Sequence, residues 1–143
     1  MSYVKRAVLD NFKNNLKPNK VLVLLGARRV GKTQLIKKYL ETVEEKVLQL
    51  NGEDLNDARL LEERTLENYA RLFQNIGLLV IDEAQAVQDI GLILKFIVDH
   101  IEGIKVIATG SSMFDLANKL GEHKKKKKRV FFLYPLSQIE FSN

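Results

Sequence analysis

Residues 21–33, VLVLLGARRVGKT, decide the fold. The five apolar residues before Gly26 predict a short strand buried on both faces of a sheet. From Gly26 to Thr33 the segment matches the pattern G-x-x-x-x-G-K-[ST] at every fixed position. The glycines let the backbone curl so that successive N–H groups point at phosphate oxygens, and the next helix adds its positive dipole end. The segment therefore predicts a phosphate-binding loop between a buried strand and a helix.

The residues of this loop have distinct expected roles. Lys32 is expected to reach the β- and γ-phosphates of a nucleotide, and the Thr33 hydroxyl is expected to bind Mg²⁺. A glycine-containing turn without chemical function is the alternative, but the apolar strand before the loop and the amphipathic helix after it favour the phosphate site. The candidate nucleotide-binding residues are Gly26, Ala27, Arg28, Arg29, Val30, Gly31, Lys32, Thr33 and Gln34.

A second apolar run, at residues 78–81, ends in the paired acids Asp82 and Glu83. We expect Asp82 to hold Mg²⁺ directly or through water, and Glu83 to orient or deprotonate an attacking water. An ordinary acidic turn is the alternative. Paired carboxylates favour ATP hydrolysis over phosphate transfer to a small-molecule hydroxyl. A guanine nucleotide is disfavoured because Asn118-Lys119-Leu120-Gly121 lacks the aspartate of an N-K-x-D base reader.

Apolar runs and helical patterns alternate along the whole chain. Such alternation predicts an α/β domain whose parallel sheet has helices on both faces. Polar residues directly follow several of the expected strands. Open α/β sheets bind their ligands at this edge, where the carboxyl ends of the strands lie. The expected helices cover residues 3–17, 35–43, 54–75 (mostly), 92–101 and a short stretch up to 120, and the expected strands cover 21–25, 47–50, 78–81, 106–108 and 130–134.

The composition fits one globular domain, with 143 residues of which 45% are hydrophobic and 29% charged. The absence of cysteine excludes disulfide scaffolds, Cys-ligated zinc and thiol catalysis. His100 and His123 are too few for most catalytic metal sites. No apolar run reaches transmembrane length and no signal peptide is evident, so a cytoplasmic location without membrane contact is expected.

The net charge of +5 comes from one short run, Lys124–Lys128 with Arg129. The rest of the chain has 17 basic and 18 acidic residues, and this near balance argues against a broad nucleic-acid-binding surface. A solvated loop is the simplest interpretation of the run. A local nucleic-acid contact is the alternative, and it would show a steep dependence of binding on salt.

Taken in order, the strings D-E-A-Q at 82–85, T-G-S-S at 109–112 and L-Y-P-L-S at 133–137 resemble those of prokaryotic AAA-superfamily ATPases. The most similar type has a C-terminal domain of unknown function after the ATPase module. The resemblance implies a three-layer P-loop NTPase fold with a five-stranded parallel sheet, in which the phosphate-loop strand lies between the fourth and fifth strands. ATP or ADP and Mg²⁺ are the implied ligands.

The resemblance also implies roles for individual side chains. A hydroxyl of Thr109, Ser111 or Ser112 corresponds to a polar sensor that contacts the γ-phosphate or the attacking water, and Ser111 joins Lys32 and Glu83 as a candidate catalytic residue. Gln85 corresponds to a residue that positions the water or the sensor. A turn and a helix cap are the alternative for the hydroxyls, because Ser and Thr cap helices readily.

One departure from the family pattern bears on activity. Relatives carry a Gly-Arg pair before the fifth strand, whereas residues 121–129 here read GEHKKKKKR. The chain is also expected to be a fragment that lacks a helical lid and a C-terminal domain. We therefore expect Mg²⁺-dependent ATP binding with slow or no hydrolysis. The alternative is a non-hydrolysing nucleotide switch that acts on a protein or DNA through the missing region, and oligomerisation stays open.

Overall fold

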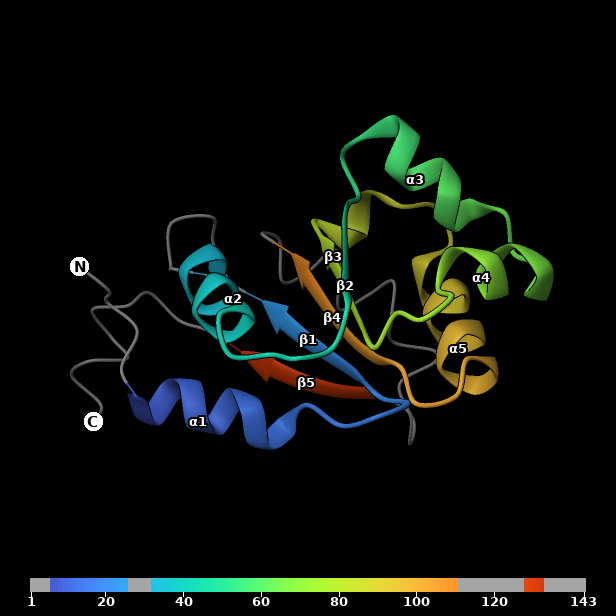
Figure 1. Cartoon of the computed structure of the whole chain (residues 1–143). Coiled ribbons are helices and arrows are strands. Elements are labelled where there is room, and N and C mark those ends of the chain that lie inside the picture. Colours follow the sequence, from blue (N-terminus) through green and yellow to red (C-terminus); the bar gives the residue numbers. More distant parts are fainter. Residues whose placement is uncertain (1–5, 26–31, 111–127, 133–143) are drawn as a thin grey trace.

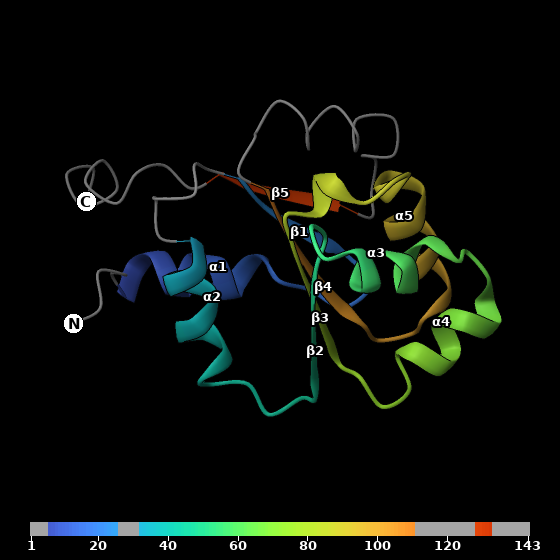
Figure 2. The same ribbon diagram turned by 90° about the horizontal axis from the view of Figure 1, so that it is seen from above.

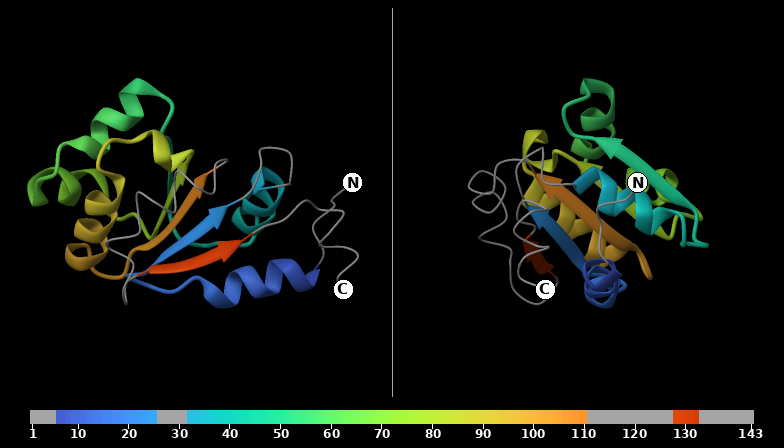
Figure 3. Two further views of the ribbon diagram at one scale, coloured as in Figure 1. Left: turned by 180° about the vertical axis from the view of Figure 1, so that it is seen from behind. Right: turned by 90° about the vertical axis from the view of Figure 1, so that its left-hand side faces the viewer.

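The computed structural model describes residues 6–25, 32–110 and 128–132 (Figure 1). Its five strands form one sheet in the order β2-β3-β4-β1-β5. Every neighbouring pair is parallel, and the arrowheads of β1, β4 and β5 point the same way in Figure 3. The strands are β1 (Val21–Leu25), β2 (Val47–Asn51), β3 (Leu78–Asp82), β4 (Lys105–Gly110) and β5 (Lys128–Phe132).

The strand before the phosphate-loop motif lies between two others, as predicted. In this register Leu25 of β1 is level with Gly110 of β4 and with Phe132 of β5. Val21 to Leu24 are at most 3% exposed, which confirms that the apolar run is buried on both faces. The predicted α/β architecture, with its parallel sheet and the expected strand order, is therefore confirmed.

Helices cover both faces of the sheet (Figure 2). One face carries α1 (Arg6–Asn15) and α2 (Lys32–Leu40), and the other carries α3 (Leu55–Glu62), α4 (Leu66–Leu72) and α5 (Ile90–His100). Alternate residues of β1 point to opposite faces, as the pleat of a strand requires, so each face has its own core. The core under α1 and α2 includes Phe12, Leu22, Leu24, Leu35, Tyr39, Val80 and Ile107; the core under α5 includes Val23, Leu61, Tyr69, Ile81, Ile93, Ile97 and Val106.

The helix expected over residues 54–75 is in fact two short helices, α3 and α4. Asp54 caps the first, because its carboxylate accepts from the amides of residues 56 and 57. Thr65 caps the second by accepting from the Asn68 amide at 3.0 Å. The Asn68 side chain donates to the carbonyls of Leu60 and Glu63. These side-chain caps compete with a continuous helix and explain the break.

Other boundaries also differ from expectation. The fifth strand spans Lys128–Phe132 instead of 130–134, so the last residues of the basic run belong to the sheet. Backbone pairing with β1 decides this, since Lys128 is level with Val21. The helix expected from residue 92 begins at Ile90. Only one side of this helix is buried, and Leu92 on the other side is 40% exposed. A short 3₁₀ turn, η1 (Ala84–Ala86), was not predicted.

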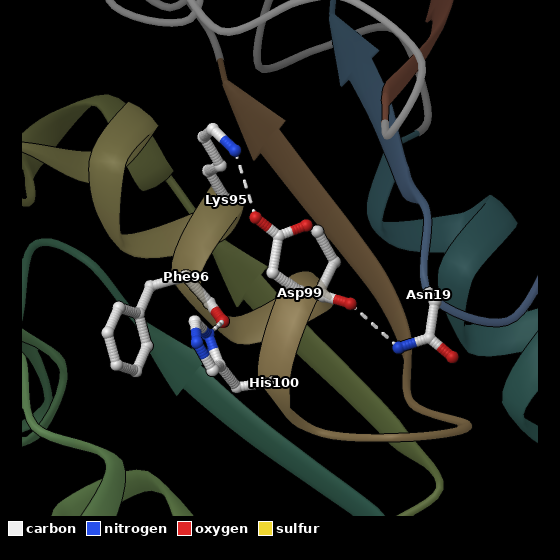
Figure 4. Close-up of polar contacts among 6 residues, drawn as sticks. Asn19, Lys95, Phe96, Asp99 and His100 are labelled. Atoms are coloured by element: carbon white, nitrogen blue, oxygen red, sulfur yellow. Dashed lines mark hydrogen bonds and ion pairs between the residues drawn. The ribbon is translucent and has the colours of Figure 1, made fainter.

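Asn19 ties the C-terminus of α5 to the start of β1 (Figure 4). Its side-chain nitrogen Nδ2 donates to the backbone carbonyls of Val98 and Ile101. Its side-chain oxygen Oδ1 accepts from the backbone N–H of Gly103. Helix ends leave carbonyls without partners, and here a residue 79 positions away supplies a donor. Asn19 itself has a left-handed backbone, with φ of 58°.

Several predicted elements lie outside the described residues. They are the loop at 26–31, the short helix after β4, the lysines at 124–127 and the L-Y-P-L-S string. Within the described ranges, no helix has both the length and the apolar character that spanning a membrane would require.

Candidate functional site

The carboxyl ends of β1, β3 and β4 meet at one edge of the sheet. Ile81 of β3 is level with Ala108 of β4, and Leu25 of β1 is level with Gly110 of β4. Asp82 therefore ends its strand beside Thr109. The residues after Leu25 are the predicted phosphate loop, so the two motifs that are far apart in sequence leave the sheet at the same edge.

Thr109 connects the two predicted acids. Its hydroxyl donates to Oδ1 of Asp82 at 2.6 Å, and it accepts the backbone N–H of Glu83 at 3.2 Å. The Thr109 side chain is fully buried, whereas Asp82 is exposed. A short bond from a hydroxyl to a carboxylate is among the stronger hydrogen bonds, so it orients an otherwise exposed carboxylate.

Glu83 has a backbone conformation that few side chains adopt. Its φ of 49° and ψ of 52° lie in the left-handed region. This conformation costs a non-glycine residue about 1–3 kcal/mol and persists only where the surroundings impose it. The residue is only 8% exposed, and Nε2 of Gln85 donates to its Oε1 at 2.8 Å. The carboxylate predicted to handle water is thus buried and held by the next polar residue of the D-E-A-Q string.

Gly52 is a site residue that the sequence reasoning missed. Its N–H donates to the carbonyl of Asp82 at 2.7 Å, and a Cβ at this position would lie 2.3 Å from the carbonyl oxygen of Glu83. Only glycine fits so close an approach. In the sequence, Asn51 and Gly52 directly follow the strand expected at 47–50. The available signal was that this strand ends at the same sheet edge as the paired acids.

The phosphate-loop motif is described only at its flanks. β1 ends at Leu25 and α2 begins at Lys32, while Gly26 to Gly31 lie outside the described residues. Lys32 and Thr33 form the first turn of α2, and Gln34 is exposed. Ser111 and Ser112 also lie outside the described residues, so Thr109 alone of the three candidate sensor hydroxyls has a described place.

Asp82 borders a cleft of about 310 Å³ between α2 and the strands β2 and β3. Two other clefts, of about 390 and 430 Å³, lie against α5 and at the opposite edge of the sheet, away from the paired acids. The cleft between α2 and the strands β2 and β3 leaves the Asp82 carboxylate accessible to solvent. Its lining residues are Ile36, Lys37, Leu40, Gln49, Val80 and Asp82.

The donor set at this edge suits Mg²⁺ shared with a nucleotide. Within the described ranges, no three His, Cys, Asp or Glu residues are grouped so that they could hold a metal by themselves. Mg²⁺ in nucleotide sites is typically bound by one or two protein oxygens, with phosphates and waters completing the octahedron. One oriented carboxylate, that of Asp82, fits that pattern.

Comparison with known families agrees with the geometry. A family model described as an AAA domain matches residues 18–142. The match covers most of the chain, including both predicted motifs. No curated protein matches the chain.

Proposed function

The chain belongs to the AAA domain family, and from this membership we propose that it binds ATP with Mg²⁺ and hydrolyses it slowly. The observation that carries the proposal is the oriented acid pair. Asp82 and Glu83 are held by Thr109 and Gln85 at the sheet edge where the phosphate-loop motif begins. Such a convergence of a phosphate loop with two carboxylates is typical of P-loop ATPases.

Nucleotide binding is assigned to the loop from Gly26 to Gln34. Its backbone N–H groups and the first turn of α2 bind the phosphates, and Lys32 supplies the positive charge at the terminal ones. Thr33 and Asp82 would hold Mg²⁺, which would neutralise the negative charge that develops on the phosphate oxygens. Asp82 is suited to this role because it is exposed and its orientation is set from β4.

Water activation is assigned to Glu83. Its carboxylate is the second acid beyond a buried strand, and general bases of this kind act within hydrogen-bond reach of the water they deprotonate. Gln85 positions that carboxylate through the 2.8 Å bond to Oε1. Ser111 is proposed as the hydroxyl that contacts the γ-phosphate, in keeping with its place in the T-G-S-S string.

Slow hydrolysis follows from the missing Gly-Arg pair. A well-placed arginine contributes about 10³–10⁵ to the rate of such reactions, and residues 121–127, GEHKKKK, offer lysines in place of a guanidinium before β5. Lysine lacks the planar fork of arginine. The same departure favours a second candidate function, a nucleotide switch that binds without hydrolysis. Release of phosphate from bound ATP distinguishes the two.

The first test is the loss of the loop lysine. Lys32→Ala should weaken binding of MgATP at least about tenfold, because a hydrogen bond to a charged group contributes about 1.5–3 kcal/mol. Lys38→Ala is the matched control, since it removes the same charge from the same helix one and a half turns away. Isothermal titration calorimetry measures both affinities. Equal affinities for Lys32→Ala and the wild type would refute the nucleotide site.

A further inference from the structure

Thr109 is fully buried between β3 and β1 and contacts both members of the acid pair. It is one of three hydroxyls that the family resemblance offers as the γ-phosphate sensor. Its hydrogen bonds bear on that choice, because each hydroxyl has only one proton to donate.

The single proton of Thr109 is already used. It is donated to Oδ1 of Asp82 at 2.6 Å, and an oxygen lone pair accepts the N–H of Glu83 at 3.2 Å. To donate to a phosphate, the hydroxyl would have to release Asp82. At 0% exposure, the hydroxyl also presents no surface to a phosphate in solution.

We propose that Thr109 is a positioning residue that fixes the Asp82 carboxylate for Mg²⁺, and that it is not the hydroxyl that contacts the γ-phosphate. The inference rests on the proposed function, since it presupposes a Mg²⁺–nucleotide complex at this edge. The contact with the γ-phosphate then falls to Ser111 or Ser112. Side chains that orient a metal-binding carboxylate in this way commonly control metal affinity without touching the metal.

The sheet explains how Thr109 can hold Asp82 rigidly. Residues 78–81 of β3 pair in register with residues 105–108 of β4, and Asp82 and Thr109 directly follow the last pair of this ladder. On the other side β4 pairs with β1, where Thr109 is level with Leu24. The hydroxyl is therefore carried by a strand that is hydrogen-bonded on both edges, and it has little freedom to follow a moving carboxylate.

The test separates metal binding from nucleotide binding. Thr109→Val removes the hydroxyl at nearly constant shape, and Thr109→Ser keeps it. A fluorescent ATP analogue is titrated in EDTA, and Mg²⁺ is then titrated at a fixed concentration of the analogue. For Thr109→Val, the Mg²⁺ concentration at half-maximal enhancement should rise about 10- to 100-fold, the usual cost of losing such a partner. Binding in EDTA should change by less than about twofold, and Thr109→Ser should restore the Mg²⁺ midpoint to within about threefold.

Asp82→Asn provides the control for a merely structural effect. When the carboxylate is absent, Thr109→Val should produce no further shift of the Mg²⁺ midpoint, as the logic of a double-mutant cycle requires. A wild-type Mg²⁺ midpoint in Thr109→Val, or an equal loss of binding in EDTA, would overturn the inference while leaving the nucleotide site in place.

Two further outcomes are distinguishable from these. If the wild type binds no nucleotide in either buffer, the proposed function fails and this inference fails with it. If circular dichroism shows that Thr109→Val does not fold, Thr109→Ala carries the same titration, because alanine fits within the space that threonine occupies. The same expected and contrary results then apply to that variant.

Discussion

At the scale of single residues, three neighbours hold the Asp82–Glu83 peptide in place. Gly52 donates to the Asp82 carbonyl from the turn that follows β2, and Thr109 accepts the Glu83 N–H from β4. Gln85 holds the Glu83 carboxylate from the turn that follows. Contacts from both neighbouring strands explain how a non-glycine residue keeps a left-handed backbone at this point.

Glu83→Gln should slow ATP turnover by about 10²-fold or more, while ATP affinity stays the same. The amide is a poor base, but it has nearly the shape of the carboxylate and keeps an oxygen that can accept from Gln85. The measurement is release of labelled phosphate under single-turnover conditions, with affinity from the same calorimetric titration. Equal rates for the two proteins would remove Glu83 from water activation.

At the scale of elements, the link between Asn19 and α5 holds the helix on its face of the sheet. Three hydrogen bonds join this one side chain to the last turn of the helix and to the loop that follows. The backbone N–H of Asn19 also donates to the carbonyl of Ile104 at 2.6 Å. The entry into β1 and the approach to β4 are thereby fixed together, and all five residues of β1 pair with β4.

Asn19→Gly should lower the free energy of unfolding by about 2 kcal/mol, since it removes hydrogen bonds that contribute about 0.5–1.5 kcal/mol each. Glycine tolerates the positive φ of 58°, so the change isolates the side-chain bonds from backbone strain. Asn75→Gly is the matched control, because Asn75 has a φ of 64° and is exposed. Urea denaturation measures the free energy of unfolding of both variants, and an unchanged m-value shows that only stability has changed. Equal stability losses in the two variants would mean that the link to α5 contributes nothing.

At the scale of the whole molecule, an ion pair joins parts that are distant in sequence at the amino-terminal edge of the sheet. Nζ of Lys105 lies 2.9 Å from Oε2 of Glu45, which connects the start of β4 to the segment before β2. The hydrogen bond from Lys105 lowers the pKa of Glu45 below its ordinary value, and the bond to Glu45 raises the pKa of Lys105. Both side chains are partly exposed, at 27% and 33%, so the stabilisation is modest.

The pKa of Glu45 is lower in the folded protein than in the unfolded chain. The ion pair therefore stabilises the fold at pH values above the ordinary glutamate pKa of 4.5. This contribution is lost as the pH falls through the lowered folded value. The stability difference between the wild type and Lys105→Met should thus be constant from about pH 6 to 8 and should shrink as the pH falls below about 4. Urea denaturation at several pH values measures the difference. Lys17→Met controls for net charge because Lys17 is exposed. A pH-independent difference for Lys105→Met would contradict the assignment.

Much of the fold follows from local patterns. An apolar run of four or five residues is long enough for a strand and too short for a stable helix, which is why β1 and β3 were predicted within one residue of their observed ends. The boundaries between helices were harder to predict, because the caps at Asp54 and Thr65 divide a segment whose helical pattern looks continuous. The start of β5 depends on its register with β1, which its own residues do not encode.

The chemistry proposed for the candidate site was predicted from sequence patterns. The loop motif at 26–33 and the acids at 82 and 83 are short-range patterns, in which residue type and spacing are the whole signal. Tertiary structure alone decided which groups hold those acids. Gly52 and Thr109 lie 30 and 27 residues from Asp82, and they meet it only because β2 and β4 flank β3. Hydrogen bonds act over about 3 Å, so the register of neighbouring strands, and not the order of residues along the chain, selects the partners.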